Sequence, residues 1–134
     1  MKSLLKFLAF ISLLFILSVS TGFGQSLYFC EDVDDDGYPK GESSSFTIGR
    51  NGGYLYMLVR TGEECNTEKV YFDIYKVNSR GKETFDNTLE METESNWVWF
   101  WKQITFYDDG TYNVYVSDED GYPITSGQVK VSYR

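Results

Sequence analysis

The densest group of side chains able to do chemistry is an acidic run near the start of the chain. Asp32, Asp34 and Asp36 occupy alternate positions, and Gly37 follows them. Alternate carboxylates before a glycine are typical of a calcium loop, in which the carboxylates converge on the ion and the glycine allows a sharp bend. Ser43 stands where such a loop would need a bidentate glutamate. The segment therefore predicts either a weak calcium site or a solvated acidic turn, and no other cofactor is expected.

A second group is aromatic. Trp97, Trp99 and Trp101 alternate in the segment NWVWFWK. On an unbroken strand they would share one face, which points outward if Ile104 and Phe106 lie in the core. An exposed row of rings predicts a contact surface, because Trp and Tyr dominate protein interfaces and large apolar patches usually have a role. Tyrosines expected at outward positions on other strands extend this candidate face: Tyr71, Tyr75 and Tyr115.

Two other interpretations of the aromatic residues stay open. The rings could stack on the apolar faces of a sugar, with nearby acids accepting bonds from its hydroxyl groups. Alternatively, the tryptophans could be packing residues, because a β-bulge near Lys102 would turn some of them into the core. Alternation within one strand does not choose among a protein partner, a carbohydrate and packing.

Catalytic constellations are scarce. The sequence holds no histidine, so Ser-His-Asp and Cys-His arrangements are impossible and the commonest general base is missing. Paired carboxylates could still hydrolyse a glycosidic bond, but 20 acidic residues bring carboxylates together by chance. The excess of acid over base also argues against nucleic acid and anionic membranes as partners. We therefore expect a protein that is not an enzyme.

The first 24 residues resemble a cleavable signal peptide. Lys2 and Lys6 precede the apolar run FLAFISLLFIL and then small and polar residues. The run is too short to span a bilayer as a helix. Cleavage is expected after Gly24, with Ser20 as the alternative position. The sequence thus predicts a secreted, periplasmic or cell-surface protein that is not inserted in a membrane after cleavage, the alternative being an uncleaved N-terminal anchor.

The two cysteines follow the leader. In an exported chain, Cys30 and Cys65 are predicted to form one disulfide. The alternative is a pair of buried free thiols. A zinc site is not expected, because it would need four Cys or His ligands.

The rest of the chain predicts strands and turns. Apolar residues alternate at period two in seven segments, and no segment shows helical periodicity. Asn51-Gly52-Gly53 and Asp120-Gly121 are turn signals between such segments. Residues expected to face the core include Leu55, Met57, Val59, Val70, Phe72, Ile74, Val114, Val116, Val129 and Val131.

One segment resembles a known family. Residues 104–116 include Asp108-Asp109-Gly110 before Tyr112, and this pattern is similar to the corner before the penultimate strand of immunoglobulin-like and fibronectin-like domains, where a tyrosine hydroxyl bonds back to the backbone. Val114 stands where antibody domains have a core cysteine. The resemblance implies an all-β, immunoglobulin-like antiparallel sandwich of seven or eight strands over residues 25–134. A small closed β-barrel is the alternative.

Together these features predict an exported, non-catalytic module that binds a protein partner through its aromatic face. A carbohydrate-binding module is the second interpretation. A structural component of an envelope assembly, with no small ligand, is the third.

Overall fold

The computed structural model describes residues 25–134, so the predicted leader lies outside the described residues. In this range no helix is long and apolar enough to cross a membrane. The strands of this part of the chain are β1 (Ser26–Cys30), β2 (Asp32–Val33), β3 (Pro39–Lys40), β4 (Ser45–Ile48), β5 (Gly53–Arg60), β6 (Lys69–Val77), β7 (Glu83–Glu92), β8 (Trp99–Phe106), β9 (Gly110–Asp118) and β10 (Pro123–Tyr133).

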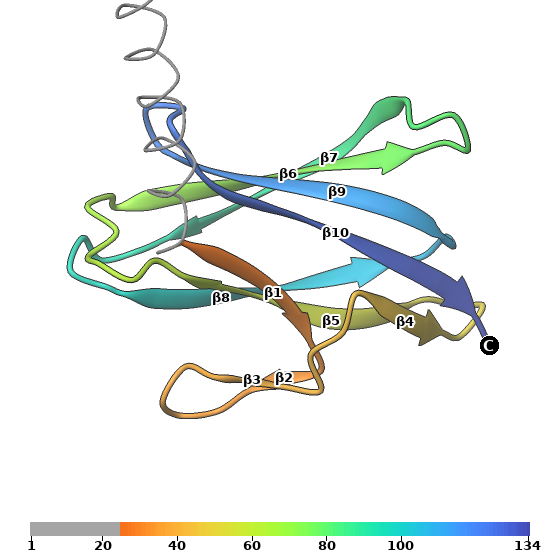
Figure 1. Cartoon of the computed structure of the whole chain (residues 1–134), viewed down its shortest axis with the longest axis horizontal. Coiled ribbons are helices and arrows are strands. Elements are labelled where there is room, and N and C mark those ends of the chain that lie inside the picture. The colour runs from red at the N-terminus through yellow and green to blue at the C-terminus, as the bar shows by residue number, and fades with distance from the viewer. Residues whose placement is uncertain (1–24) are drawn as a thin grey trace, which may run out of the picture.

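The strands form a sandwich of two layers, with a small hairpin outside it (Figure 1). One layer has the strand order β1-β5-β8, and the other has the order β4-β10-β9-β6-β7. The hairpin of β2 and β3 lies on the side of the three-stranded sheet that faces away from the five-stranded sheet. Because the sheets stay separate, the closed-barrel alternative is wrong and the sandwich prediction is confirmed.

The core lies between the two layers, where the alternation placed it. The period-two residues of β5, β6, β9 and β10 are all buried there, together with Phe29, Ile48, Phe100, Ile104 and Phe106. Leu58 is an exception, because it is fully buried although it follows Met57 and so points to the outer face of its sheet. Leu58 lies between its two cross-strand neighbours, Tyr28 on β1 and Trp101 on β8.

The predicted tyrosine corner is present. Tyr112 is buried and its hydroxyl donates to the carbonyl oxygen of Asp108 at 2.8 Å. Its ring packs on Phe106, with 4.6 Å between the ring centroids. Burial, followed by the nearby Asp86 and other charges, raises the pKa of Tyr112 to about 12. This bond fixes the turn between β8 in one sheet and β9 in the other.

The glycine-rich turn at residues 49–53 does not close a hairpin within one sheet. β4 pairs in parallel with β10, whereas β5 pairs with β1 and β8. Gly52 donates its N–H to the Gly49 carbonyl at 3.0 Å and has a φ of 106°, which favours glycine. The turn therefore carries the chain from one layer to the other.

Candidate functional site

The three tryptophans do not share one exposed face. β8 begins at Trp99, so Trp97 lies in the preceding loop and its side chain does not follow the alternation of the strand. Trp97 and Trp99 are half-buried, and only Trp101 is well exposed, at 44%. The prediction of a continuous row of outward indole rings is therefore wrong.

Trp99 lies beneath the hairpin of β2 and β3. Gly37, at the tip of the hairpin, is buried against the Trp99 ring, so that a Cβ at position 37 would be 2.3 Å from its Cδ2 atom. Arg60, opposite Trp99 on β5, holds the same tip through a hydrogen bond from Nη1 to the Gly37 carbonyl oxygen. The Arg60 guanidinium also lies 4.2 Å from the centroid of the Tyr38 ring. Trp99 is thus a packing residue that fixes the hairpin to the sheet.

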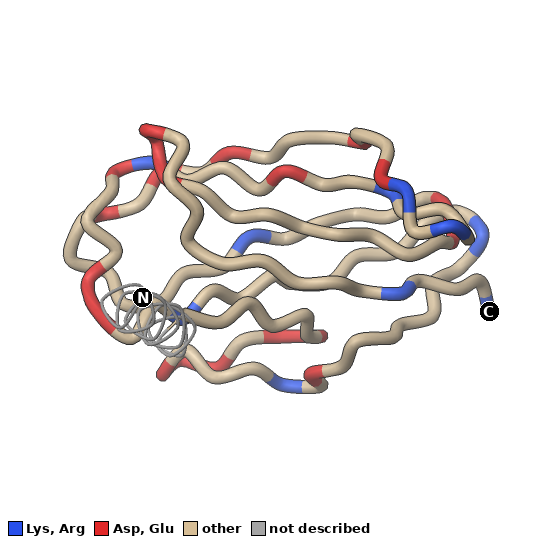
Figure 2. Tube along the Cα trace, turned by 45° about the horizontal axis from the view of Figure 1, so that its top comes forward, with Lys and Arg blue, Asp and Glu red and all other residues tan. Residues whose placement is uncertain are grey.

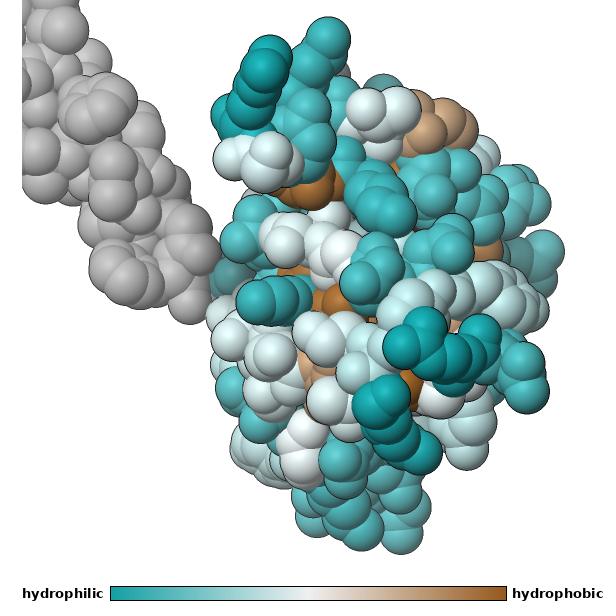
Figure 3. Space-filling view, turned by 90° about the vertical axis from the view of Figure 1, so that its right-hand side faces the viewer, coloured by the Kyte–Doolittle hydropathy of each residue, from teal (hydrophilic) through white to brown (hydrophobic). Residues whose placement is uncertain are grey.

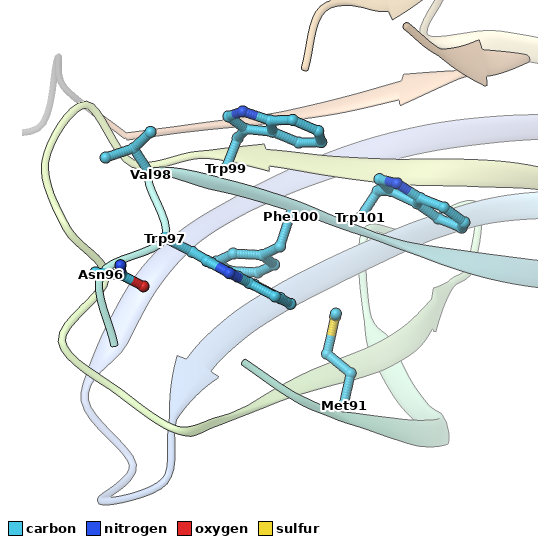
Figure 4. A pocket seen from close by; sticks show the side chains of 7 residues that line it. All are labelled: Met91, Asn96, Trp97, Val98, Trp99, Phe100 and Trp101. Carbon is cyan, nitrogen blue, oxygen red and sulfur yellow. The ribbon is translucent and has the colours of Figure 1, made fainter. Parts of the chain in front are cut away.

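Trp97 turns toward the interior at the open side of the sandwich. Its Nε1 donates to Glu94 Oε2 at 2.9 Å, and its ring packs at the margin of the core. Figure 4 shows Trp97 and Phe100 on one side of the β8 ribbon, with Met91 of β7 beyond them. β7 and β8 are edge strands of the two sheets, so Trp97 and Met91 are half-buried at the gap between the layers, whereas Phe100 stays buried at 2% exposure.

Trp101 lies on the other side of the same strand. Its ring meets Tyr56 edge-on at 5.0 Å, and Tyr56 meets Tyr54 in the same way at 6.1 Å. Tyr54 is 61% exposed. The outer face of the three-stranded sheet therefore presents a short line of rings that ends at the free edge of β8.

The two sides of β8 together form a groove, which we call the edge groove. It has a volume of about 570 Å³ and is mostly apolar. Trp99 and Trp101 lie above β8 in Figure 4, and Phe100 and Trp97 lie below it, so the groove follows the strand edge itself. Its lining residues are Met91, Asn96, Trp97, Val98, Trp99, Phe100 and Trp101.

Acidic residues gather next to the edge groove. A second hollow, which shares Asn96 with the groove, contains four carboxylates and one ammonium group: Glu68, Glu92, Glu94, Glu119 and Lys69. Figure 2 shows acidic residues at this end of the molecule and several Lys and Arg residues at the opposite end, near the C terminus. The C-terminal end is mostly hydrophilic, with small apolar patches (Figure 3). The edge groove thus lies in a negatively charged part of the surface.

The predicted tyrosines lie on a different face. Tyr71, Tyr75 and Tyr115 are on the outer face of the five-stranded sheet, across the core from the three-stranded sheet. Tyr75 meets both Phe85 and Tyr115 edge-on at 5.6 Å, and no ring contact joins Tyr71 to them. We call Tyr75, Phe85 and Tyr115 the tyrosine patch. The structure therefore divides the single predicted contact face into two separate surfaces.

A polar network borders the tyrosine patch. Glu83 accepts hydrogen bonds from the Tyr115 hydroxyl and from Asn113 Nδ2, the latter at 2.7 Å. The bond from Tyr115, followed by the one from Asn113, lowers the pKa of Glu83. Gln128 Nε2 in turn donates to Asn113 Oδ1 at 2.8 Å. Rings and oriented polar groups therefore lie side by side on this sheet.

The acidic run near the start of the chain forms a turn and does not gather a metal site. Asp34 Oδ1 accepts the backbone N–H groups of Asp36 and Tyr38, each at 2.9 Å, and Asp32 Oδ1 accepts the N–H of Val33. Among residues 25–134, no three His, Cys, Asp or Glu side chains are grouped to hold a metal ion. Asp32, Asp34 and Asp36 therefore do not converge as the calcium interpretation requires. Asp118 accepts from Asp120 and Tyr122 in the same way, and Asn78 accepts from Arg80 and Lys82, so one hairpin turn occurs three times in the described residues.

The predicted disulfide is also corrected. Cys30 and Cys65 are free, the first buried and the second half-buried. Cys30 stands opposite Tyr56, whereas Cys65 lies beyond Arg60 and donates its N–H to the Trp97 carbonyl. The strand from Tyr56 to Arg60 spans roughly 13 Å, too far for a disulfide, which needs Cα atoms within about 7 Å. Burial raises the pKa of the Cys30 thiol.

Comparisons with known proteins bear on the fold. No protein-family model matches the sequence, and a comparison with curated protein sequences finds no match. Among solved structures, the PmoD soluble domain from Methylocystis sp. is similar at a TM-score of 0.50 and 12% identity, with 81% of this chain and 90% of that chain covered. The two-layer sandwich with its tyrosine corner is the immunoglobulin-like fold that the sequence resemblance implied. An immunoglobulin-like protein from Pseudomonas aeruginosa is similar at a TM-score of 0.48 and 9% identity, covering 79% and 91%. The CARDB domain of a Pyrococcus furiosus protein reaches 0.41 and 10%, covering 82% and 96%.

Sequence reasoning missed part of the groove in this immunoglobulin-like domain. The period-two alternation places Met91 and Phe100 on the inner faces of their strands, so it gives no sign that they line a groove. Both nevertheless line the groove, Met91 half-buried and Phe100 buried, because β7 and β8 end their sheets on the same side. Strand order decides this position at the groove, and no residue pattern in the sequence encodes it directly.

Proposed function

We propose that this chain is an exported, non-catalytic interaction module that binds a protein partner at the edge groove. The observation that supports the proposal most is the concentration of Trp97, Trp101, Phe100 and Met91 around an edge strand. Tryptophan is enriched among the residues that contribute most to binding energy, and a groove encloses a ligand better than a flat face. Export follows from the leader-like first 24 residues.

The chemistry of the described residues favours binding over catalysis. The pKa shifts of Cys30, Glu83, Tyr112 and Tyr115 each have a packing or hydrogen-bond cause that lies away from the edge groove. The sequence has no histidine, so a nucleophile would lack its usual base. A groove of aromatic rings without an acid–base pair is suited to binding a partner.

The test compares two exposed aromatic residues on opposite sheets. The exported form of the chain is coupled to a support, exposed to the cell-surface extract of its own source, and cross-linked. A genuine partner is retained by the wild type and by Tyr115→Ala, and binding falls about 10-fold or more for Trp101→Ala. Equal retention by both variants would remove the edge groove from the proposal. Circular dichroism and Tm measurements establish that both variants are folded.

The tyrosine patch supports carbohydrate binding as a second candidate. Tyr75, Phe85 and Tyr115 offer ring surface beside the Glu83 carboxylate and the Asn113 amide, which can bond sugar hydroxyl groups. Phe85 is 58% exposed. A panel of soluble glycans in a thermal-shift assay tests this candidate. A shift with one sugar that disappears in Phe85→Ala and persists in Trp101→Ala would favour it, and a flat panel would count against it.

A further inference from the structure

The free edge of β8 has a defined pattern of backbone groups. Thr61 donates its N–H to the Val98 carbonyl oxygen at 2.9 Å, at the end of the β5–β8 ladder. In an antiparallel pair, opposite residues alternate between hydrogen-bonded and non-hydrogen-bonded positions. Counting from Val98, the β8 residues bonded to β5 are Phe100, Lys102, Ile104 and Phe106. The intervening residues, Trp99, Trp101, Gln103 and Thr105, direct their N–H and C=O groups to the free edge.

These free groups lie within the edge groove and its continuation. Beyond Trp101, a shallower hollow is lined by Met91, Trp101, Lys102, Gln103 and Thr105. A strand laid along β8 would place one set of side chains toward Trp101 and the other toward Phe100 and Trp97, because side chains alternate between faces. The groove therefore has backbone partners along its floor and pockets on both sides, the arrangement that peptide addition to a sheet uses.

The negative charge beside the edge groove indicates which kind of strand would bind there. Residues 25–134 carry all 20 acidic side chains and, without Lys2 and Lys6, 10 of the 12 basic ones, a net charge of −10. Four carboxylates against one ammonium group line the hollow that adjoins the groove at Asn96. A second copy of this chain would bring two such negative surfaces together. A segment with Lys or Arg near one end would instead place its charge beside these carboxylates.

We propose that the partner contributes an extended, basic segment that pairs with β8 through the backbone groups of Trp101, Gln103 and Thr105. This inference rests on the proposed function and specifies its partner. Apolar side chains at alternate positions of the segment would fill the two sides of the groove. A Lys or Arg at the end near Asn96 would lie beside Glu92 and Glu94.

Two proline variants test the backbone pattern before any ligand is needed. Gln103→Pro removes an N–H that points to solvent, so the variant should fold with a Tm close to that of the wild type. Lys102→Pro removes an N–H bonded to β5 and should unfold the domain or lower its Tm strongly. The reverse order of the two Tm values would overturn the assigned pattern and with it the inference.

A displayed library of random octapeptides is then selected on the exported wild-type chain. We expect enriched peptides to alternate apolar residues and to carry Lys or Arg near one end. Their binding should fall about 10-fold or more for Gln103→Pro and stay near the wild-type value for Gln103→Ala, because only the former blocks backbone pairing. Replacing the basic residue of an enriched peptide by Glu should also weaken binding.

The outcomes separate this inference from the proposed function. Peptides that need Trp101 yet bind Gln103→Pro as well as the wild type would overturn strand addition and leave the groove as a side-chain docking site. Enriched peptides that are acidic would overturn the charge assignment. If no enriched peptide depends on Trp101 for binding, this result would count against both strand addition and the edge groove as a binding site.

Discussion

Gly37 lies so close to the indole of Trp99 that a Cβ at position 37 would stand 2.3 Å from Cδ2 and 2.4 Å from Cε2. Its φ of 81° is also one that side chains rarely adopt. This contact joins the acidic hairpin to the outer face of the three-stranded sheet. It explains why a tryptophan on an outward strand position is half-buried.

Gly37→Ala should therefore detach the hairpin. The variant combines a left-handed backbone penalty of roughly 1 kcal/mol with an overlap on Trp99 that costs about 1–3 kcal/mol. We expect a lower Tm and stronger acrylamide quenching of tryptophan fluorescence, since Trp99 becomes accessible. Gly81→Ala is the matched control, because Gly81 has the same φ of 81° and a Cβ there would have nothing within 4 Å. Equal Tm losses in the two variants would show that the Trp99 contact contributes nothing.

The corner tyrosine should make stability depend on alkaline pH. Burial raises the pKa of Tyr112 from its ordinary value of 10.0 to about 12, so the folded state holds this proton more tightly than the unfolded chain does. Its stabilising contribution is complete below pH 10 and is lost as the pH rises toward 12. Denaturant unfolding of the wild type should thus show decreasing stability across this window.

Tyr112→Phe should lose both the corner bond and that pH dependence. Removing the hydroxyl from the Asp108 carbonyl should lower stability by about 1–2 kcal/mol at neutral pH. Tyr54→Phe serves as control, because Tyr54 is 61% exposed. An alkaline stability profile that is the same in Tyr112→Phe and the wild type would contradict the assignment.

The period-two alternation was sufficient to predict the core. Val114 and Val116 face inward because successive side chains on a strand point to opposite faces, and only the inner face of a sandwich is dry. The tyrosine corner could also be predicted from the sequence, because the Tyr112 hydroxyl bonds to Asp108 in the turn just before it. Both predictions rely on local geometry that the sequence carries directly.

The candidate site was less predictable because it depends on contacts between distant segments. Leu58 is buried on the outer face although the alternation predicts exposure, and Trp99 is covered by a hairpin from the start of the domain. Trp97 leaves the row of tryptophans because the strand starts only at Trp99. The docking of a hairpin and the first residue of a strand are tertiary outcomes that composition and spacing do not determine.

The distance between Cys30 and Cys65 predicts that both cysteines are free thiols. After denaturation under non-reducing conditions, we expect Ellman's reagent to titrate both thiols of each chain. In the folded protein, Cys65 should react before Cys30, whose thiol is buried and has a raised pKa. Dithiothreitol should leave the Tm unchanged. A denatured chain without free thiols, or a Tm that falls on reduction, would show that the protein forms the bridge after rearrangement.

The stability of the acidic hairpin should depend on the Asp34 side chain as a hydrogen-bond acceptor and not on calcium. Asp34→Ala removes the acceptor of two backbone N–H groups and should cost about 1–2 kcal/mol. Asp34→Asn keeps an acceptor oxygen and should stay closer to the wild type. Calcium and EDTA should leave the Tm of the wild type unchanged. A calcium-dependent rise that disappears in Asp34→Asn would instead show that the carboxylates gather around an ion.

Lys102 should prevent two chains from associating through the free edge of β8. Its partner across the ladder is Met57, a fully buried residue, so the lysine occupies a core-facing position on an edge strand and is half-exposed beside the groove. A charge at such a position opposes pairing of β8 with the β8 of a second copy, because that pairing would bury two lysines, whereas a partner segment would cover only one. Lys102→Val should therefore cause concentration-dependent association in gel filtration. Lys130→Val changes the net charge equally at an exposed position on β10 and should remain like the wild type. Identical elution of both variants at all concentrations would show that Lys102 has no such role, and the edge would then have to be protected by the negative charge of the surface alone.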